Sequence, residues 1–301
     1  MRIERILMPT DFSDCANAAL THAVALAHQF GAELHLLHAV VLHEEDPNRP
    51  GHSFPGLEEL HRRLKEAAAT GMEQLINDRQ TKGITVFKAQ RRGLTAAPEI
   101  LAYAEDEAID LIVLGTHGRR GLRHFLLGSV AEEVLRSANC PVLTIRDEEE
   151  VRRFHEVDLI VVPFDFSADS RRALEVARDL AAAYKSRIEV VHAVEAAMML
   201  STYSIDFDYG AVFRRIERRL GEEIESLGDQ DISIEPRVLD GHAASAITRH
   251  AEGSQADLIV LASHGLSGLW HFMLGSVAEK VIRSASCPVL TLRPPTEQAK
   301  S

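Results

Sequence analysis

Cysteine is scarce in this sequence. Only Cys15, Cys140 and Cys287 occur, with no CxxC pair among them, and this odd set argues against a disulfide framework. Cys140 and Cys287 each stand directly before a Pro-Val-Leu-Thr segment. Because an unpaired cysteine behaves as a small hydrophobe, we expect both to be buried at the start of a strand.

Long apolar runs are missing as well. No run of about 18 apolar residues occurs, so the sequence predicts no transmembrane helix. The first residues carry the charges of Arg2, Glu4 and Arg5, and they lack the apolar core and cleavage site of a signal peptide. We therefore expect a cytoplasmic protein without a membrane partner.

Basic residues are in the minority, with 33 Lys and Arg against 45 Asp and Glu and a formal net charge of −12. Binding to a phosphate backbone needs clustered positive charge, and most of this surface would repel it. The short basic clusters at residues 91–92, 119–120 and 214–219 are more typical of a solvated face than of a nucleic-acid site. We expect no nucleic-acid partner.

What the sequence does contain is a long internal repeat. Residues 115–146 (GTHGRRGLRHFLLGSVAEEVLRSANCPVLTIR) and residues 262–293 (ASHGLSGLWHFMLGSVAEKVIRSASCPVLTLR) are identical at 22 of 32 positions. Earlier segments match too, since residues 5–13 resemble residues 159–167. The sequence therefore predicts two similar domains, residues 1–147 and 156–295, joined by a short charged linker.

Each half alternates short apolar strands with helices of amphipathic period. This order is typical of a parallel sheet covered by helices on both faces. We predict an α/β protein made of two tandem five-stranded parallel-sheet domains, Rossmann-like and arranged as a pseudo-dimer. The expected strands are residues 5–9, 33–41, 84–90, 111–114 and 142–145, then 159–163, 187–194, 232–239, 258–262 and 289–292.

The last strand of each half has a special position. Residues 142–145 and 289–292 are apolar, and each would lie at the edge of its own sheet, where an apolar strand needs cover. We predict that these two strands join the halves. A further homodimer of the whole chain is left open.

A glycine-bearing loop stands at the centre of each repeat. In the first half, Gly115 ends an apolar strand, Gly118 follows, and Gly128 and Ser129 open a helix. Glycine lets a ligand approach the backbone, and free N–H groups at a helix start attract anions. This pattern favours a phosphate near Gly128, Ser129 and Val130, although it is neither a Walker A motif nor a GxGxxG fingerprint.

Helix capping is the alternative explanation for two of these features. Ser129 with Glu132, like Ser276 with Glu279, fits the S-x-x-E capping box, which by itself accounts for a serine before a helix. Asp11 at the end of the first strand suits a hydrogen bond to a base or a ribose. It could equally cap the first helix together with Ser13.

Three motifs that occur in order, twice, resemble the universal stress protein family in its tandem form. They are Pro9-Thr10-Asp11-Phe12-Ser13, Leu37-His38-Ala39, and the Gly115-x2-Gly118-x9-Gly128-Ser129 loop. The resemblance covers residues 3–146 and 157–293. It implies a five-stranded parallel α/β fold, like that of the adenine nucleotide alpha hydrolases, and binding of ATP or another adenine nucleotide, with or without Mg²⁺.

The resemblance also implies where a nucleotide would lie. It sets adenine between Thr10, Asp11 and the backbone of Ala39, and ribose near Leu114 and Gly115. The phosphates would meet backbone groups of Gly118, Gly128, Ser129 and Val130, with the side chain of His117 within reach. In the second half the corresponding residues are Asp165, Ala193, Gly265, Gly275, Ser276 and Val277.

The second half departs from this pattern at two places. Ala262 stands where Gly115 stands, so a methyl group would crowd a ribose, and Phe164 replaces Thr10. We expect a weaker second site for this reason.

The histidines do not suggest a metal site. His117 and His124, like His264 and His271, lie seven residues apart without cysteine or carboxylate at ligand spacing. His38 and His192 stand at strand ends, where we expect packed, hydrogen-bonded side chains.

Three functions remain compatible with the sequence. The first is a nucleotide-binding regulatory protein of the stress response, with an unidentified protein partner. The second is an enzyme with weak ATPase or phosphotransfer activity, although no nucleophile–base pair can be identified. The third is an interaction scaffold with degenerate sites.

Overall fold

The computed structural model describes residues 1–41, 57–77, 81–116, 127–146, 156–195, 209–228, 231–263 and 274–293. The two halves have the same order of elements. The first contains β1 (Arg5–Pro9), α1 (Asp14–Phe30), β2 (Glu33–Val41), α2 (Leu57–Asn77), β3 (Val86–Gly93), α3 (Ala96–Asp106), β4 (Leu111–Gly115), α4 (Ser129–Ser137) and β5 (Val142–Ile145). The second contains β6 (Leu159–Pro163), α5 (Ala168–Tyr184), β7 (Arg187–Val194), α7 (Tyr209–Glu225), β8 (Ile234–Asp240), α8 (Ala243–Gly253), β9 (Leu258–Ala262), α9 (Ser276–Ser284) and β10 (Val289–Leu292).

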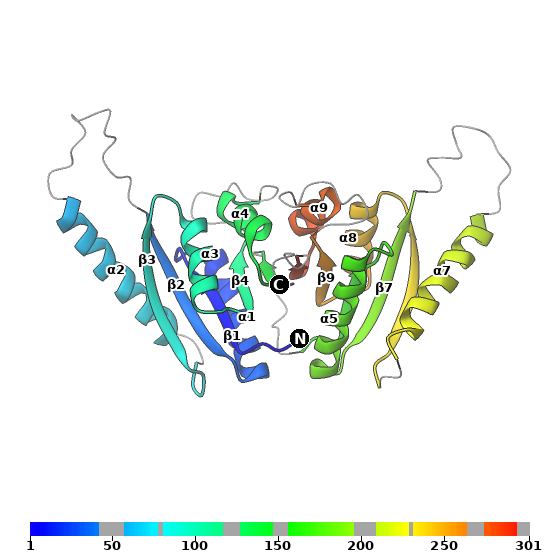
Figure 1. Ribbon diagram of the computed structural model, residues 1–301, viewed down its shortest axis with the longest axis horizontal. Helices are drawn as coiled ribbons and strands as arrows, with labels where there is room; N and C mark the ends of the chain where they lie inside the picture. Colours follow the sequence, from blue (N-terminus) through cyan, green and yellow to red (C-terminus); the bar gives the residue numbers. More distant parts are fainter. Residues whose placement is uncertain are drawn as a thin grey trace, which may run out of the picture.

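All ten strands form one sheet, in the order β3-β2-β1-β4-β5-β10-β9-β6-β7-β8. Within each half the strands are parallel, and the two halves meet where β5 pairs with β10 in the antiparallel sense. Figure 1 shows α2 and α7 at opposite ends of the molecule and α4 and α9 near its middle. The predicted fold class and the predicted pairing of the last strands are confirmed.

The order of strands reverses direction next to the first strand of each half. The chain leaves β1 toward β2 on one side and returns to β4 on the other, and β6 lies in the same way between β7 and β9. In open parallel sheets, ligands bind beyond the carboxyl ends of the strands at this switch point. Each half therefore has one such point.

The first helix of each half begins and ends as local chemistry requires. The Ser13 side chain accepts a hydrogen bond from the Ala16 amide, and Ser167 does the same for Ser170. Gly31 ends α1 in the left-handed conformation that glycine tolerates. Lys185 ends α5 at φ 61°, so the second half repeats this helix end without glycine.

The third strand of each half starts later than predicted. β3 covers Val86–Gly93 instead of residues 84–90, and β8 covers Ile234–Asp240 instead of residues 232–239. Pairing of β3 with β2 continues to the last residue of β2, past the final apolar position of β3. Register with the neighbouring strand, more than apolar character, decides where an outer strand ends.

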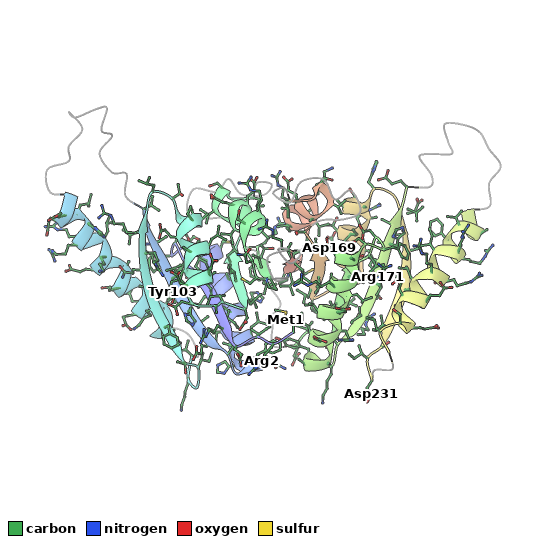
Figure 2. All side chains as sticks on the ribbon, in the orientation of Figure 1. Met1, Arg2, Tyr103, Asp169, Arg171 and Asp231 are labelled. Atoms are coloured by element: carbon green, nitrogen blue, oxygen red, sulfur yellow. The ribbon has the colours of Figure 1, made fainter. Side chains whose placement is uncertain are left out.

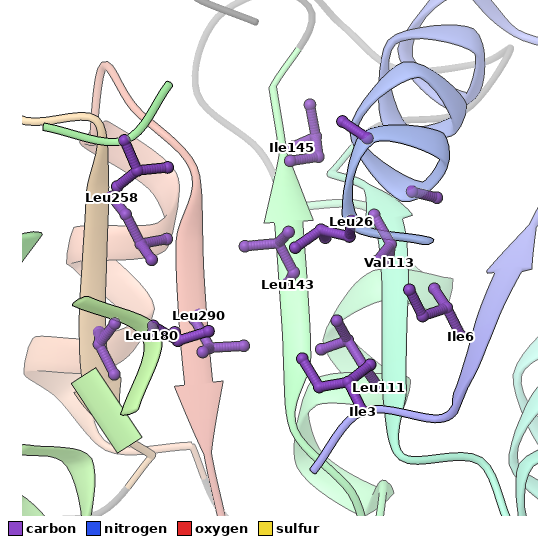
Figure 3. Packing of buried hydrophobic residues seen from close by; sticks show 14 of the residues in the cluster. Ile3, Ile6, Leu26, Leu111, Val113, Leu143, Ile145, Leu180, Leu258 and Leu290 are labelled. Carbon is purple, nitrogen blue, oxygen red and sulfur yellow. The ribbon is translucent and has the colours of Figure 1, made fainter. Parts of the chain in front are cut away.

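A continuous core joins the halves on each face of the sheet. On the face of α1 and α5, one cluster includes Leu26, Leu143, Leu180 and Leu290, drawn from both halves (Figure 3). On the other face a second cluster joins residues of α3 and α4 to residues of α8 and α9. Burial of such apolar surface is the main stabilising term.

The cysteines lie near this core. Cys15 is buried, whereas Cys140 and Cys287 are only half-buried and pack at the border of the second cluster. The expectation that Cys140 and Cys287 are buried is therefore met only in part. Even so, burial raises the pKa of the Cys140 thiol to about 12, so the thiol is not an activated nucleophile.

Candidate functional site

A cavity of about 340 Å³ opens at the switch point of the second half. Its walls come from the carboxyl ends of β6, β7 and β9, from α8, and from the start of α9. The structure brings together here five residues that the sequence predicted for this half: Asp165, Ala193, Gly275, Ser276 and Val277. In the first half, Asp11, Ala39, Gly128, Ser129 and Val130 occupy the equivalent strand and helix ends.

The chain makes an unusual turn directly after each first strand. Phe12 and Phe166 have φ values of 64° and 66°, which is rare for bulky residues. An Asx turn supports this backbone, since Oδ1 of Asp11 accepts a hydrogen bond from the Ser13 amide at 3.0 Å and Asp165 accepts one from Ser167 at 3.0 Å. Strain repeated at the mouth of both sites is typical of functional positions.

Two hydrogen-bonding groups of Ala39 point toward the site. Along β2, the Glu33 amide donates to the Glu4 carbonyl, just before β1, whereas the Leu34 amide donates to the Thr85 carbonyl, just before β3. The Leu37 carbonyl accepts from the Thr10 amide at 2.8 Å, just beyond the end of β1. Because residues two apart along a strand face the same neighbour, the N–H and C=O of Ala39 face the side of β1, like those of Glu33 and Leu37. They lie beyond the end of β1.

Ala193 has the same geometry in the second half, because the Val191 carbonyl accepts from the Phe164 amide at 2.8 Å. One backbone edge therefore offers a neighbouring donor and acceptor. The arrangement is equivalent in both halves.

The helix starts at α4 and α9 present free donors. Gly128 is the N-cap of α4, and its own amide donates to the Thr116 carbonyl at 2.8 Å. Gly275 donates in the same way to Ser263. The next three amides have no partner among the residues that the structure describes: Ser129, Val130 and Ala131 in α4, and Ser276, Val277 and Ala278 in α9. The macrodipole adds to their attraction for an anion.

This geometry corrects one interpretation of the sequence. The capping box is wrong, because Ser129 and Ser276 are the first helical residues and the N-caps are the glycines, which have no side chain to accept a hydrogen bond. The placement of phosphates on backbone groups at this helix start stays a prediction, in which the Gly128 amide already donates to Thr116.

Gly115 lies against α1, where a side chain would collide with Cys15. A Cβ at this position would lie 2.7 Å from the Cys15 Sγ and 3.0 Å from the Cys15 carbonyl. The missing side chain therefore makes room for α1, whereas Leu114 belongs to the buried cluster on the opposite face. Packing against Cys15 thus gives a second reason for this glycine. The crowding of a ribose by Ala262, which lines the second cavity, stays a prediction.

Phe164 lines the second cavity, but its ring packs in the core. The ring is buried in the core on the α5 face and packs edge-on against Phe166 at 5.3 Å. The Phe164 amide repeats the backbone bond of Thr10. The side chain of Thr10, itself buried, accepts from the Phe12 amide at 3.0 Å. Unequal affinity of the two sites thus stays a prediction.

Both strand-end histidines are packed, as predicted. Nδ1 of His38 donates to the Thr10 carbonyl at 2.7 Å, and Nδ1 of His192 donates to the Phe164 carbonyl at 2.7 Å. The rings also lie against Phe12 and Phe166. Within the described ranges, no group of three or more His, Cys, Asp and Glu is placed to hold a metal ion.

The sequence did not predict some of the residues near the second site. Ser170 and Ser263 are buried and line the cavity, together with Ala243 and Ile247 of α8. The guanidinium of Arg219 lies 4.1 Å from the centre of the Phe166 ring. Apolar periodicity identifies such helix positions only as core, so no local signal marks them as cavity wall.

An ion pair joins α5 and α7 near the second site. Figure 2 labels Asp169 and Arg171 on α5. Arg171 forms a bidentate ion pair with Glu223 of α7, at 2.8 and 2.7 Å, and this hydrogen bonding holds the pKa of the Glu223 carboxyl below its usual range.

Several predicted residues lie outside the described residues. They are His117, Gly118 and Gly265, together with His124, His264, His271, Arg119 and Arg120.

Comparison with known proteins gives one consistent family. The model of the universal stress protein family matches residues 2–146 and again residues 156–293. A universal stress protein of Methanocaldococcus jannaschii is 34% identical over 143 residues, which cover 48% of this chain and 82% of that protein. One from Synechocystis is 25% identical over 97% of this chain and its own full length.

Among solved structures, a universal stress protein from Archaeoglobus fulgidus superposes with a TM-score of 0.67. It is 24% identical, and the match covers 97% of each chain, so it shows a shared tandem fold. Among the helices of the described ranges, none combines the length and apolar character that crossing a membrane requires.

Proposed function

The chain belongs to the universal stress protein family, and on that premise we propose that it is a regulatory protein that binds an adenine nucleotide, ATP above all, in each of its two halves. The proposal keeps residues 1–147 and 156–295 as the two domains. It assigns the protein to the stress response through its family.

One observation supports this function most directly. In each half, the first three amides of a helix have no partner among the described residues, and a backbone edge at the same switch point offers one donor and one acceptor. In the second half both features line one cavity of about 340 Å³, together with Asp165. A ligand with an anionic end and a flat, hydrogen-bonding end would satisfy both.

The proposed pose follows from these groups. Adenine lies against Ala39 or Ala193, and the ribose lies near Asp11 or Asp165. The phosphates meet the amides of Ser129 and Val130, or of Ser276 and Val277. Ala131 and Ala278 add a third amide in each half. No step of catalysis is part of the proposal.

The test uses a glutamate placed at each helix start. A carboxylate in the first turn favours the helix, but it occupies the anion site and repels phosphate. We expect calorimetry with ATP to find two sites in the wild type, one in Ser129→Glu, one in Ser276→Glu and none in the double variant. Gln74→Glu, which adds the same charge on the exposed face of α2, should retain both sites.

The single variants also decide whether the sites are equal. Ser129→Glu leaves only the second site. If that site is weaker, this variant has a higher dissociation constant than Ser276→Glu. Equal dissociation constants in the two single variants would contradict the predicted difference in affinity between the sites. Absence of ATP binding by the wild type, or unchanged binding by the double variant, would refute the proposed function. Mass identification of a co-purified nucleotide distinguishes retained ATP from its hydrolysis products.

A further inference from the structure

Arg146 of the first half reaches into the second half. It follows β5 directly, and its Nη1 donates a hydrogen bond to the carbonyl of Ala285 at 3.0 Å. Ala285 is the C-cap of α9 and is 1% exposed. The contact therefore joins the end of one half to the end of the helix that opens the other half's site.

The chemistry of this contact suits a helix end. The last carbonyls of a helix have no partner within the helix, and a positive charge there complements the macrodipole. α9 has nine residues, so only about 13 Å separates its two ends. Its first residues, Ser276, Val277 and Ala278, line the cavity. Fixing the end of so short a helix also fixes the amides at its start.

The backbone beside Arg146 is tied to the first site. The carbonyl of Ile145 accepts from the Thr116 amide at 2.9 Å and from the Cys15 thiol at 3.4 Å. The Thr116 carbonyl in turn accepts from the Gly128 amide, where α4 starts. Figure 3 shows Ile145 at the end of β5, which lies beside β10.

We propose that Arg146 is a positioning residue for the second site: it belongs to the first half, yet it orients α9 and strengthens anion binding at the start of that helix. This inference rests on the proposed nucleotide site of the second half. It makes that site depend on the first half, so the two halves are not independent binding modules.

The binding test isolates the second site. In the Ser129→Glu background, Arg146→Ala should raise the dissociation constant for ATP about two- to fivefold, the range expected for a charge at a helix terminus. Arg146→Gln keeps a side-chain donor without the charge. Its dissociation constant for ATP should lie between that of the Ser129→Glu background and that of Arg146→Ala. Arg63→Ala, which removes an exposed charge of α2 at the outer end of the first half (Figure 1), is the control and should stay within twofold.

Two results would overturn the proposal. One is an unchanged second-site constant in Arg146→Ala. The other is an equal loss when the same substitution is measured in the Ser276→Glu background, which reports on the first site, because that loss would be general destabilisation.

Hydrogen exchange gives an independent readout. Arg146→Ala should lower the protection of α9 amides, while those of α4 keep theirs. If no variant binds ATP, the proposed function fails. The role of Arg146 in orienting α9 is still decided, since unchanged protection of α9 would refute it.

Discussion

At the scale of single residues, both sites contain strained backbone in the same place. Phe12 and Phe166 adopt the left-handed conformation, which costs a bulky residue about 1–3 kcal/mol. In each half an aspartate side chain and the serine that follows hold the turn. The strain orients the aspartate at the end of its strand, where the proposed ribose lies.

Gly115 shows how a residue's role depends on its neighbour. It lies 100 positions along the chain from Cys15, and no local pattern connects the two. Because a Cβ would come within 2.7 Å of the Cys15 Sγ, only glycine permits α1 to pack at its observed distance.

We therefore predict that Gly115→Ala lowers the free energy of unfolding by about 1–3 kcal/mol, as overpacking of a core does. Cys15→Ala in the same chain should recover part of that loss, because it removes the nearer atom but leaves the backbone contacts. Urea denaturation measures both. A loss below about 0.5 kcal/mol in Gly115→Ala would contradict the packing argument.

At the scale of elements, the two halves attach equivalent helices by different chemistry. α3 meets β2 through a hydrogen bond of 2.9 Å between Nδ1 of the buried His35 and the Tyr103 hydroxyl (Figure 2 labels Tyr103). In the second half, Nε2 of His250 on α8 donates to Glu189 of β7 at 2.7 Å, and Arg187 donates to the same carboxylate at 2.9 Å.

The pKa of Glu189 indicates which way pH acts on this contact. Burial alone raises the pKa of this carboxyl, but hydrogen bonds from His250 and Arg187 outweigh burial and hold the pKa below its ordinary 4.5. A carboxyl whose pKa is lowered by folding stabilises the protein above the unfolded value. That stabilisation is lost as pH falls through the folded value.

We predict that Glu189→Gln lowers the free energy of unfolding by about 1–3 kcal/mol at pH 7. The difference from the wild type should shrink below pH 4.5, where protonation removes the wild-type charge. Glu4→Gln is the control, because Arg2 and Glu4 form an exposed pair worth about 0–1 kcal/mol. A pH-independent loss in Glu189→Gln would contradict the ion-pair explanation.

At the scale of the whole molecule, the halves share their interior. Leu143 and Leu290 face each other across the pairing of β5 with β10, and they belong to one buried cluster. Further contacts cross between α1 and α5: Gln29 donates to the Ala183 carbonyl at 2.9 Å, and the rings of Phe30 and Tyr184 meet edge to face. Neither half completes its core alone.

We predict that the chain unfolds in urea as one cooperative unit. Leu143→Ala and Leu290→Ala should each lower its stability by about 2–5 kcal/mol and raise hydrogen exchange in the strands of both halves. Leu60→Ala, at an exposed position of α2, is the control and should change neither property appreciably. Two separate unfolding transitions would show that the halves are independent.

The sequence alone was sufficient for the repeat, the α/β class and the joining strands. Periodicity reports which face of an element is buried, and an apolar edge strand needs a partner. The resemblance to the universal stress protein family brought five residues of the second cavity into one prediction, and their motifs lie at strand ends that meet at one edge of the sheet.

Tertiary structure alone decided the details that depend on distant partners. Gly128 rather than Ser129 caps α4, because its carbonyl accepts the first helical hydrogen bond from the Glu132 amide. The Cβ that Gly115 lacks would meet Cys15. Arg146 finds the carbonyl of Ala285 only because β5 and β10 run antiparallel. Local sequence determines which groups a residue offers, whereas the packing of the whole chain determines which partner each group meets.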